Sequence, residues 1–339
     1  VGHLLEQERD PGPAGDHQPG DGLLPALKII AKTREFKGRM VNIHLPEKHL
    51  NCFNVTFDLN PDEMLEDAIV RECRRTLSFP LEEAVVDYAS LMESKAKKRQ
   101  YSAVIVAVRK EVVNAYLSLT RRAGLSVGIM DLHLSSLMRL HSYLFKLKDS
   151  PVILCNVDAE KSLLSVVTRN RILAQRYIPW GMQPILNQLM SSFELDQENS
   201  EAIGMLKRYG LMHEKFAGAT GKPPTSAAEH SDNDMTIYRT LFQLLTPYVE
   251  ELIQEFYQIT GYIRSEMATV RFGEIVIYGW ASAVNYLDQY IENRLDIPTQ
   301  IINPMAKLIW PVYATDLEDN AGAPFAPALG LALRKVSWL

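Results

Sequence analysis

A polar turn between two apolar runs offers the backbone groups most suited to bind a phosphate. The turn, Asn156–Lys161, follows the short apolar run Val152–Leu154 and precedes Ser162–Thr168, which is rich in Leu, Val and Thr. Successive N–H groups in such a turn can face an anion. A third run, Ile172–Ile178, completes a strand–turn–strand–turn–strand pattern, which predicts a β-meander that opens a new domain.

Histidines and acidic side chains are weaker candidates for chemistry. His44 and His49 flank Pro46, and His133 and His141 lie eight residues apart on one predicted helix. No metal-binding spacing joins them, so we interpret them as surface or core histidines.

The acids Glu82, Glu83 and Asp87 lie on an extended stretch, which we interpret as a solvated edge rather than an acid–base pair. The basic stretch Lys95–Arg99 is interpreted as a solvated hairpin tip. The sequence contains no GxSxG, HExxH or Walker A motif. The residues alone therefore indicate no hydrolase, metalloprotease or P-loop enzyme.

Composition sets the class of protein. The 339 residues suffice for about two domains, and the net charge of −5 gives no basic footprint for nucleic acid. The three cysteines form no CxxC motif, which favours a reducing compartment. No run is long enough for a membrane span, and no signal peptide is visible.

The first half of the chain predicts a compact α+β unit. Residues 1–22, rich in Pro, Gly and Asp from Asp10 onward, are expected to form a disordered leader or to be an artefact of the gene start. From Asn51 to Asp131 the pattern is β-α-β-β-α-β, with a helix start expected at Asn60–Glu63. The flanking elements are a helix at Leu23–Thr33, a strand at Met40–Leu45 and a helix at Leu132–Phe145.

After the meander, helical and strand patterns alternate. The predicted elements are helices at Gln183–Phe193, Asp196–Tyr209 and Met235–Arg271, a strand at Glu274–Tyr278, a helix to Leu295, a strand at Pro298–Ile302 and a terminal helix at Ala326–Val336.

Four stretches together resemble the PilM family, actin-fold proteins of type IV pilus assembly that are related to the cell-division protein FtsA. The similarity covers the chain from about Leu23 to its end. The stretches are FPLEEAVVDY at Phe79–Tyr88, VAVRKEVV at Val106–Val113 with Ala123–Leu125, the pair Ile178–Gly181 and Leu206–Gly210, and Ile275–Pro304 with Ala328–Ala332.

This resemblance implies an α/β, actin-like (ribonuclease-H-like) two-lobed fold with an inserted α+β subdomain of the FtsA/PilM type. Residues 23–150 would form the first lobe and contain the inserted subdomain 51–131. Residues 151–310 would form the second lobe, and residues 311–339 would return to the first. The family's opening hairpin, with its GIDIGSssvK phosphate loop, has no counterpart here, so we expect the first lobe to lack its opening strands.

The resemblance also implies where a nucleotide would bind. The family's D-I-G-A loop matches Asn156, Val157, Asp158 and Ala159, so its acid is replaced by Asn156 and its glycine by Asp158. An aspartate there repels phosphate.

The helix whose Glu and Lys meet the ribose keeps Lys207 but has Gly204 in place of the Glu, and the adenosine-side turn keeps Gly279 but has Trp280 in place of a glycine. Trp180 and Trp280 are interpreted either as core residues or as plugs of the cleft. We expect no cofactor, or at most a vestigial ATP/Mg²⁺ site.

The family implies a cytoplasmic protein at the inner membrane. The expected function is a non-catalytic scaffold of a type IV pilus or related secretion complex, which binds the short cytoplasmic tail of a PilN-like bitopic membrane protein. A homo-oligomer is possible, and neither nucleic-acid binding nor direct membrane insertion is expected. The alternatives are a nucleotide-binding actin-fold ATPase or switch and, ranked last, an FtsA-like membrane tether.

Overall fold

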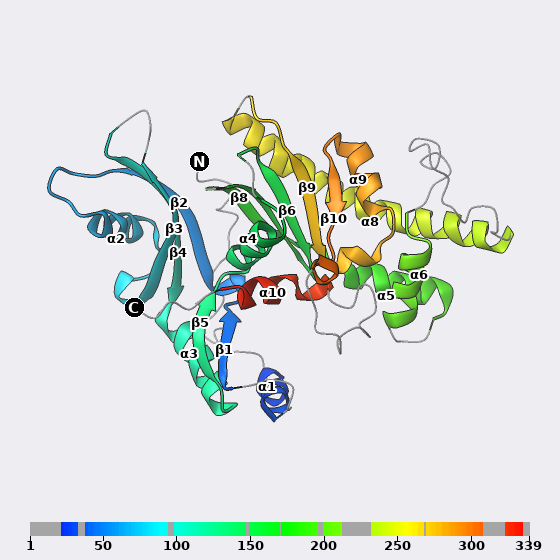
Figure 1. The fold of residues 1–339 in the computed structure, drawn as a ribbon, viewed down its shortest axis with the longest axis horizontal. Coiled ribbons are helices and arrows are strands. Elements are labelled where there is room, and N and C mark those ends of the chain that lie inside the picture. The colour runs from blue at the N-terminus through cyan, green and yellow to red at the C-terminus, as the bar shows by residue number, and fades with distance from the viewer. Residues whose placement is uncertain are drawn as a thin grey trace. The chain divides into compact units, whose positions relative to one another are not determined.

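The fold is taken from a computed structural model of the chain (Figure 1). It describes residues 22–32, 38–93, 98–146, 149–169, 171–195, 199–211, 232–267, 269–307 and 323–334. The expected leader, most of the basic stretch at 95–99 and most of segment 311–339 lie outside these residues. Two compact units emerge, one of residues 1–139 and 330–339 and one of residues 140–329. The domain boundaries expected from the sequence stay predictions.

The first unit alternates short helices and strands. Its elements are α1 (Leu23–Lys32), β1 (Met40–His44), η1 (Glu47–His49), β2 (Leu50–Asp58), α2 (Leu65–Thr76), η2 (Leu81–Glu83), β3 (Ala84–Glu93), β4 (Gln100–Arg109), α3 (Lys110–Arg122), β5 (Ser126–Asp131) and the start of α4 (His133–Leu144).

A three-stranded antiparallel sheet in the order β2-β4-β3 is the largest sheet of this unit (Figure 1). The end of β2 alternates between exposed and buried residues, whereas six consecutive residues of the central strand β4 are buried. The helix α2 packs against this sheet. The core between them comprises Val55, Phe57, Ala68, Ile69, Cys73, Ala103 and Ile105.

The expected order of elements from Asn51 to Asp131 is present, but the last strand belongs to a different sheet. β5 pairs in parallel with β1, which lies outside this range, with Met40 opposite Ser126 and His44 opposite Asp131. The three strands β2, β3 and β4 therefore form a sheet without β5.

The helix start predicted at Asn60–Glu63 is wrong. These residues form a turn in which the Glu63 carboxylate accepts the backbone N–H and the side-chain amide of Asn60, at 3.1 and 2.8 Å. Glu63 also pairs with Arg71 on the following helix. Side-chain hydrogen bonds thus close a turn that competes with the helix, and α2 begins only at Leu65.

The second unit contains the predicted meander. Its elements are the end of α4, β6 (Val152–Val157), β7 (Ser162–Thr168), β8 (Arg171–Ile178), α5 (Met182–Phe193), α6 (Asn199–Arg208), α8 (Asp232–Glu266), β9 (Glu274–Gly279), η4 (Trp280–Ala283), α9 (Leu287–Leu295), β10 (Thr299–Ile301), η5 (Pro304–Lys307), η7 (Ala323–Phe325) and the start of α10 (Ala326–Ala332).

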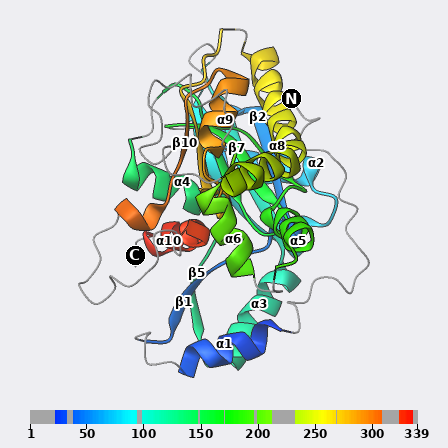
Figure 2. The same cartoon turned by 90° about the vertical axis from the view of Figure 1, so that its right-hand side faces the viewer.

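Its five-stranded sheet has the order β10-β9-β6-β7-β8. The meander is antiparallel, whereas β9 and β10 run parallel to β6. Every residue of β6 is buried, which explains its continuous apolar run. One face packs against α5, α8 and α9, and α8 crosses this face in Figure 2. Among the described residues, no helix is both long and apolar enough to cross a membrane.

His141 is a buried histidine of the second unit. It is 1% exposed, and its Nδ1 lies 2.9 Å from the hydroxyl of Tyr278 on β9. Burial lowers the pKa of His141 to about 4. In the unfolded chain the imidazole of His141 has its ordinary pKa near 6.5, so between pH 6.5 and pH 4 the unfolded state binds a proton that the folded state does not. The free energy of unfolding therefore falls as the pH is lowered from about 6.5 toward 4.

We expect His141→Gln, which can keep a hydrogen bond to Tyr278, to flatten the acid side of the stability profile. The free energy of unfolding of the wild type should fall by about 2 kcal/mol more than that of the variant between pH 7 and pH 5. Urea denaturation at both pH values measures the difference. Parallel profiles would show that His141 titrates normally in the fold.

Candidate functional site

The carboxyl ends of β6 and β9 bring together most of the residues predicted for a nucleotide. The two strands are parallel, with Asn156 opposite Tyr278 and Val157 opposite Gly279. Asp158 and Ala159 follow β6 directly. The carboxyl ends of parallel strands are the usual place for a ligand in an α/β sheet. The fold thus places these residues at the edge where a nucleotide site would form.

The turn after β6 is held against the start of α5. The N–H of Met182 donates to the carbonyl of Asp158 at 3.1 Å, and the N–H of Gln183 donates to the carbonyl of Ala159 at 2.7 Å. These N-terminal N–H groups of a helix are the ones that would otherwise bind an anion. The N–H of Asp158 is also engaged, since it donates to the carbonyl of Lys161 at 3.1 Å.

Gly181 makes this close approach possible. A Cβ at position 181 would lie 2.4 Å from the carbonyl oxygen of Ala159. The glycine at this position therefore allows the start of α5 to contact the turn after β6.

Gly279 has a similar role at the end of β9. Its φ of +84° is in the region that favours glycine, and a Cβ would lie 2.1 Å from the carbonyl oxygen of Val157. The space beside this glycine is filled by backbone of β6. Gly279 thus allows the two parallel strands to end side by side.

Asn156 and Asp158 are the two polar side chains of the turn. Asn156 is 0% exposed, and neither atom of its amide has a hydrogen-bond partner among the described residues. Asp158 is half-buried, and burial raises the pKa of its carboxyl group. Burying an amide without hydrogen-bond partners costs free energy. The side chain of Asn156 therefore lowers the stability of the fold unless a group from outside the described residues binds it.

The remaining predicted residues lie nearby. Lys207 is on α6, which packs against η4, the short helix that begins at Trp280. Trp180 is 6% exposed, and its indole N–H donates to the carbonyl of Tyr248 on α8 at 2.7 Å. Trp280 is partly buried against the same core. Trp180 is therefore a core residue.

These residues do not fit the phosphates of ATP with Mg²⁺. The amides at the start of α5 already bind carbonyl oxygens, and Asp158 adds to the same turn a carboxyl group that would repel a phosphate when ionised. Asn156 offers an amide where a carboxylate would organise Mg²⁺ through water. No group of three His, Cys, Asp or Glu side chains suited to a metal ion occurs within the described part of the chain.

A second cluster, in the first unit, was missed by the sequence reasoning. Nε2 of His44 lies 2.7 Å from the hydroxyl of Ser136, and the ring of His44 stacks on His133 with centroids 6.0 Å apart. Asp131 contributes charge nearby, so the types match a Ser-His-Asp triad.

The geometry of this cluster excludes catalysis. Ser136 is 0% exposed, so no substrate can reach its hydroxyl. Asp131 is bound instead by Arg139 and Arg334, at 2.9 and 3.0 Å. Burial alone would raise the pKa of Asp131, but the N–H of Leu132 and the two guanidinium groups hold it below its usual range. We interpret the cluster as a structural clamp.

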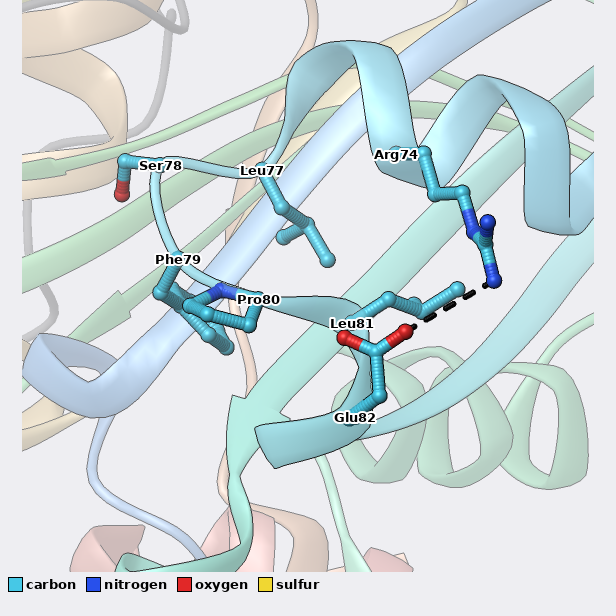
Figure 3. Close-up of a pocket in the computed structure, with 7 residues that line it drawn as sticks. All are labelled: Arg74, Leu77, Ser78, Phe79, Pro80, Leu81 and Glu82. Atoms are coloured by element: carbon cyan, nitrogen blue, oxygen red, sulfur yellow. Dashed lines mark ion pairs between the residues drawn. The ribbon is translucent and has the colours of Figure 1, made fainter.

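A groove of about 410 Å³ lies in the first unit where α2 leads into β3 (Figure 3). The segment after α2 is extended, since Leu77 and Pro80 have ψ values near +137°. The lining residues are Arg74, Leu77, Ser78, Phe79, Pro80, Leu81 and Glu82.

The groove has apolar residues between charged ends. Arg74 and Glu82 lie 3.6 Å apart across it, as the dashed line in Figure 3 shows, and both side chains are exposed. Phe79 is buried beneath the guanidinium of Arg109, 4.1 Å from the ring centroid, and Arg109 also pairs with Glu83 at 2.8 Å. An exposed ion pair contributes little to stability and can reopen for a ligand.

The sequence contains a hint of this groove. Phe79 and Pro80 interrupt the helical pattern, and the stretch they open is among those that carry the family resemblance. No spacing of side chains marks a groove, because it forms from the turn of the backbone between α2 and β3.

The sequence matches the model of a known protein family. A family model described as "Type IV pilus assembly protein PilM" matches residues 15–219 and 225–336. A solved chain of the "PilM-PilN type IV pilus biogenesis complex" is similar with a TM-score of 0.68 and 21% identity, over 95% of this chain and 88% of that chain.

Weaker likeness extends to other proteins. MreB 5 of Spiroplasma citri bound to AMPPNP has a TM-score of 0.41 and 10% identity, over 66% of this chain and 64% of that chain. A Bacteroides thetaiotaomicron protein with an actin-like ATPase fold and unknown function has a TM-score of 0.40 and 12% identity, over 92% of this chain and 82% of that chain. The expected α/β, actin-like fold class is confirmed.

Two glycines of the site test the close approach of β6 and β9. Gly279→Ala should lower the free energy of unfolding by roughly 2–4 kcal/mol, because its Cβ meets the Val157 carbonyl at a positive φ. Gly204→Ala is the control: it is in α6 with open space around it and should stabilise by about 0.5–1 kcal/mol. Thermal or urea unfolding measures both, and a neutral Gly279→Ala would contradict the packing described.

Asn156→Val tests whether the buried amide contributes to the stability of the fold. We expect unchanged stability or a gain of up to about 1–2 kcal/mol, because an unpartnered polar group is removed from a strand interior. Thr260→Val is the matched control, since its buried hydroxyl donates to the carbonyl of Phe256 at 2.7 Å and its loss should cost about 1 kcal/mol. A loss at Asn156 larger than at Thr260 would mean that the amide is satisfied in solution.

Proposed function

Because this chain belongs to the PilM family of type IV pilus assembly proteins, we propose that it is a non-catalytic cytoplasmic scaffold, which binds the cytoplasmic tail of a PilN-like membrane protein. It would act in the inner-membrane assembly complex of a type IV pilus or a related secretion machine. The partner would hold it at the membrane surface.

The observation that supports a scaffold is the closed start of α5. The N–H groups of Met182 and Gln183 bind the carbonyl oxygens of Asp158 and Ala159. Phosphate binding at this edge would require these hydrogen bonds to break and the Asp158 carboxyl group to move or take up a proton. We therefore propose that the family-aligned positions, Asn156 and Lys207 among them, maintain the fold rather than bind ATP.

Two observations support a peptide partner. A solved chain of similar fold is from a "PilM-PilN type IV pilus biogenesis complex", which supports a PilN-like partner. The first unit of this chain carries a groove with an extended backbone and a pair of exposed, opposite charges. Apolar contacts flanked by charges suit a short extended peptide.

One observation favours a second candidate, a nucleotide-switched protein of the same family. The amide of Asn156 is fully buried with no hydrogen-bond partner among the described residues. A bound ligand or an ordered water could satisfy it. This candidate requires the turn at 158–160 to release the start of α5.

Isothermal titration separates the two candidates. The purified chain is titrated with a synthetic peptide of the N-terminal cytoplasmic tail of the PilN-like protein from the same organism, and separately with Mg-ATP. We expect micromolar peptide binding and no heat from Mg-ATP up to millimolar concentration. A scrambled peptide of the same composition controls for charge alone.

Mg-ATP binding at micromolar affinity would contradict the proposal of a scaffold that binds no nucleotide, and it would support the nucleotide-switched protein. No binding of the tail peptide would contradict the proposed partner.

A further inference from the structure

The helix α1 has an apolar side that remains exposed. None of its ten residues is buried, although five of them are Leu or Ile. Its contact with α3 leaves Ile29 66% exposed and Ile30 45% exposed, whereas Leu24 and Leu27 are half-buried. A surface helix of this composition normally buries one side, so α1 presents an apolar face that another surface can cover.

Two lysines border this apolar face. Lys28 and Lys32 are one turn apart and therefore share one side of the helix, and both are exposed. Lys32 lies three positions after Ile29, so the two side chains are neighbours on the helix surface. The exposed side of α1 thus combines apolar side chains with an adjacent row of positive charge.

Further cations lie at the same end of the first unit. Arg39 precedes β1, and its carbonyl accepts the N–H of Ser126 at 2.8 Å, shortly after Arg121 and Arg122 end α3. All three arginine side chains are exposed. Figures 1 and 2 show α1 at the end of the unit where β1 starts. Together with the two lysines of α1, these arginines form what we call the basic face.

The basic face carries no compensating acid. Residues 22–32, 38–40 and 117–126 contain five basic side chains and no Asp or Glu, and none of the five forms an ion pair within the described part of the chain. The sequence of residues 33–37 adds two basic residues and one acid. Because the whole chain has a net charge of −5, this local positive charge indicates an anionic ligand.

The apolar side chains decide which anionic ligand fits. A single-stranded nucleic acid would stack its bases on aromatic rings, and residues 22–32, 38–40 and 117–126 contain no Phe, Tyr or Trp. A second copy paired about a two-fold axis would bring two basic faces together, and like charges repel. An anionic lipid surface takes cations at its phosphates and aliphatic side chains just beneath them.

We infer that α1 and the basic face bind the surface of an anionic membrane. Ile29 and Ile30 enter the boundary between headgroups and acyl chains, and the five cations contact lipid phosphates. The helix lies along the surface and does not cross it. This contact goes beyond the proposed function, because it requires no partner tail.

Vesicle flotation of the full chain tests the contact without the membrane partner. The vesicles are phosphatidylcholine alone or phosphatidylcholine mixed with phosphatidylglycerol. We expect binding at least about tenfold tighter to the mixed vesicles, because each basic side chain near an anionic surface contributes about fivefold. Raising NaCl from about 0.05 M to about 0.5 M should release most of the protein, because salt screens this attraction.

Variants of α1 separate the charged from the apolar contribution. Lys28→Glu combined with Lys32→Glu should weaken binding to the mixed vesicles at least about tenfold, and Lys28→Arg combined with Lys32→Arg should bind as the wild type does. Ile29→Ser combined with Ile30→Ser should also weaken binding about tenfold, because the apolar contact is lost while the charge is kept. Urea midpoints confirm that each variant is folded.

Matched controls change other parts of the chain in the same way. Lys146→Glu combined with Arg271→Glu alters the net charge equally at two exposed positions of the second unit. Val70→Ser removes an apolar side chain that is 41% exposed on α2. Both controls should bind the mixed vesicles as the wild type does.

Four results would overturn the inference. They are equal binding of the wild type to both kinds of vesicle, no binding to either, unchanged binding by the Lys28→Glu and Lys32→Glu variant, and tighter binding to a short duplex DNA than to the mixed vesicles. A dimer that the Ile29→Ser and Ile30→Ser variant abolishes, without vesicle binding, would show that a second copy covers α1 instead. None of these results bears on binding of the partner tail, so the scaffold proposal would stand.

Discussion

Two hydrogen bonds at the start of α5 determine what the second unit can offer to a ligand. They join the N–H groups of Met182 and Gln183 to the carbonyls of Asp158 and Ala159. They require the antiparallel pairing of β6 with β7, which sets the turn, and the absence of a Cβ at Gly181. The donors that would neutralise a phosphate are thus already engaged in the free protein.

In the proposed scaffold the two units would have different roles. The second unit is a five-stranded sheet with both faces of its central strand buried, and its ligand edge is closed by its own backbone. The first unit has a smaller, three-stranded sheet, and a groove lies where α2 leads into β3. The proposed binding of a peptide would therefore use the first unit, where the groove lies.

Local patterns in the sequence predicted most helices and strands, because apolar periodicity reports which face is buried. The meander and the stripe of α8 are examples. The pairing of β5 with β1 could not be predicted, since strands far apart in the sequence meet only through tertiary packing. The helix start at Asn60 was wrong because Glu63 bonds Asn60 and Arg71 instead. Alignment with the family's nucleotide loops identified Asn156 and Gly279 as candidate site residues. Their burial, and the hydrogen bonds of the N–H groups at the start of α5, depend on tertiary packing and could not be predicted.

Hydrogen–deuterium exchange of the whole chain, with and without the partner tail and with and without Mg-ATP, tests the central claim most directly. The account predicts slower exchange with the tail at residues 74–82, which line the groove, and no change with nucleotide at residues 156–160 and 181–183. Slower exchange at 156–160 and 279–285 with Mg-ATP, with no protection of residues 74–82 by the tail, would contradict it.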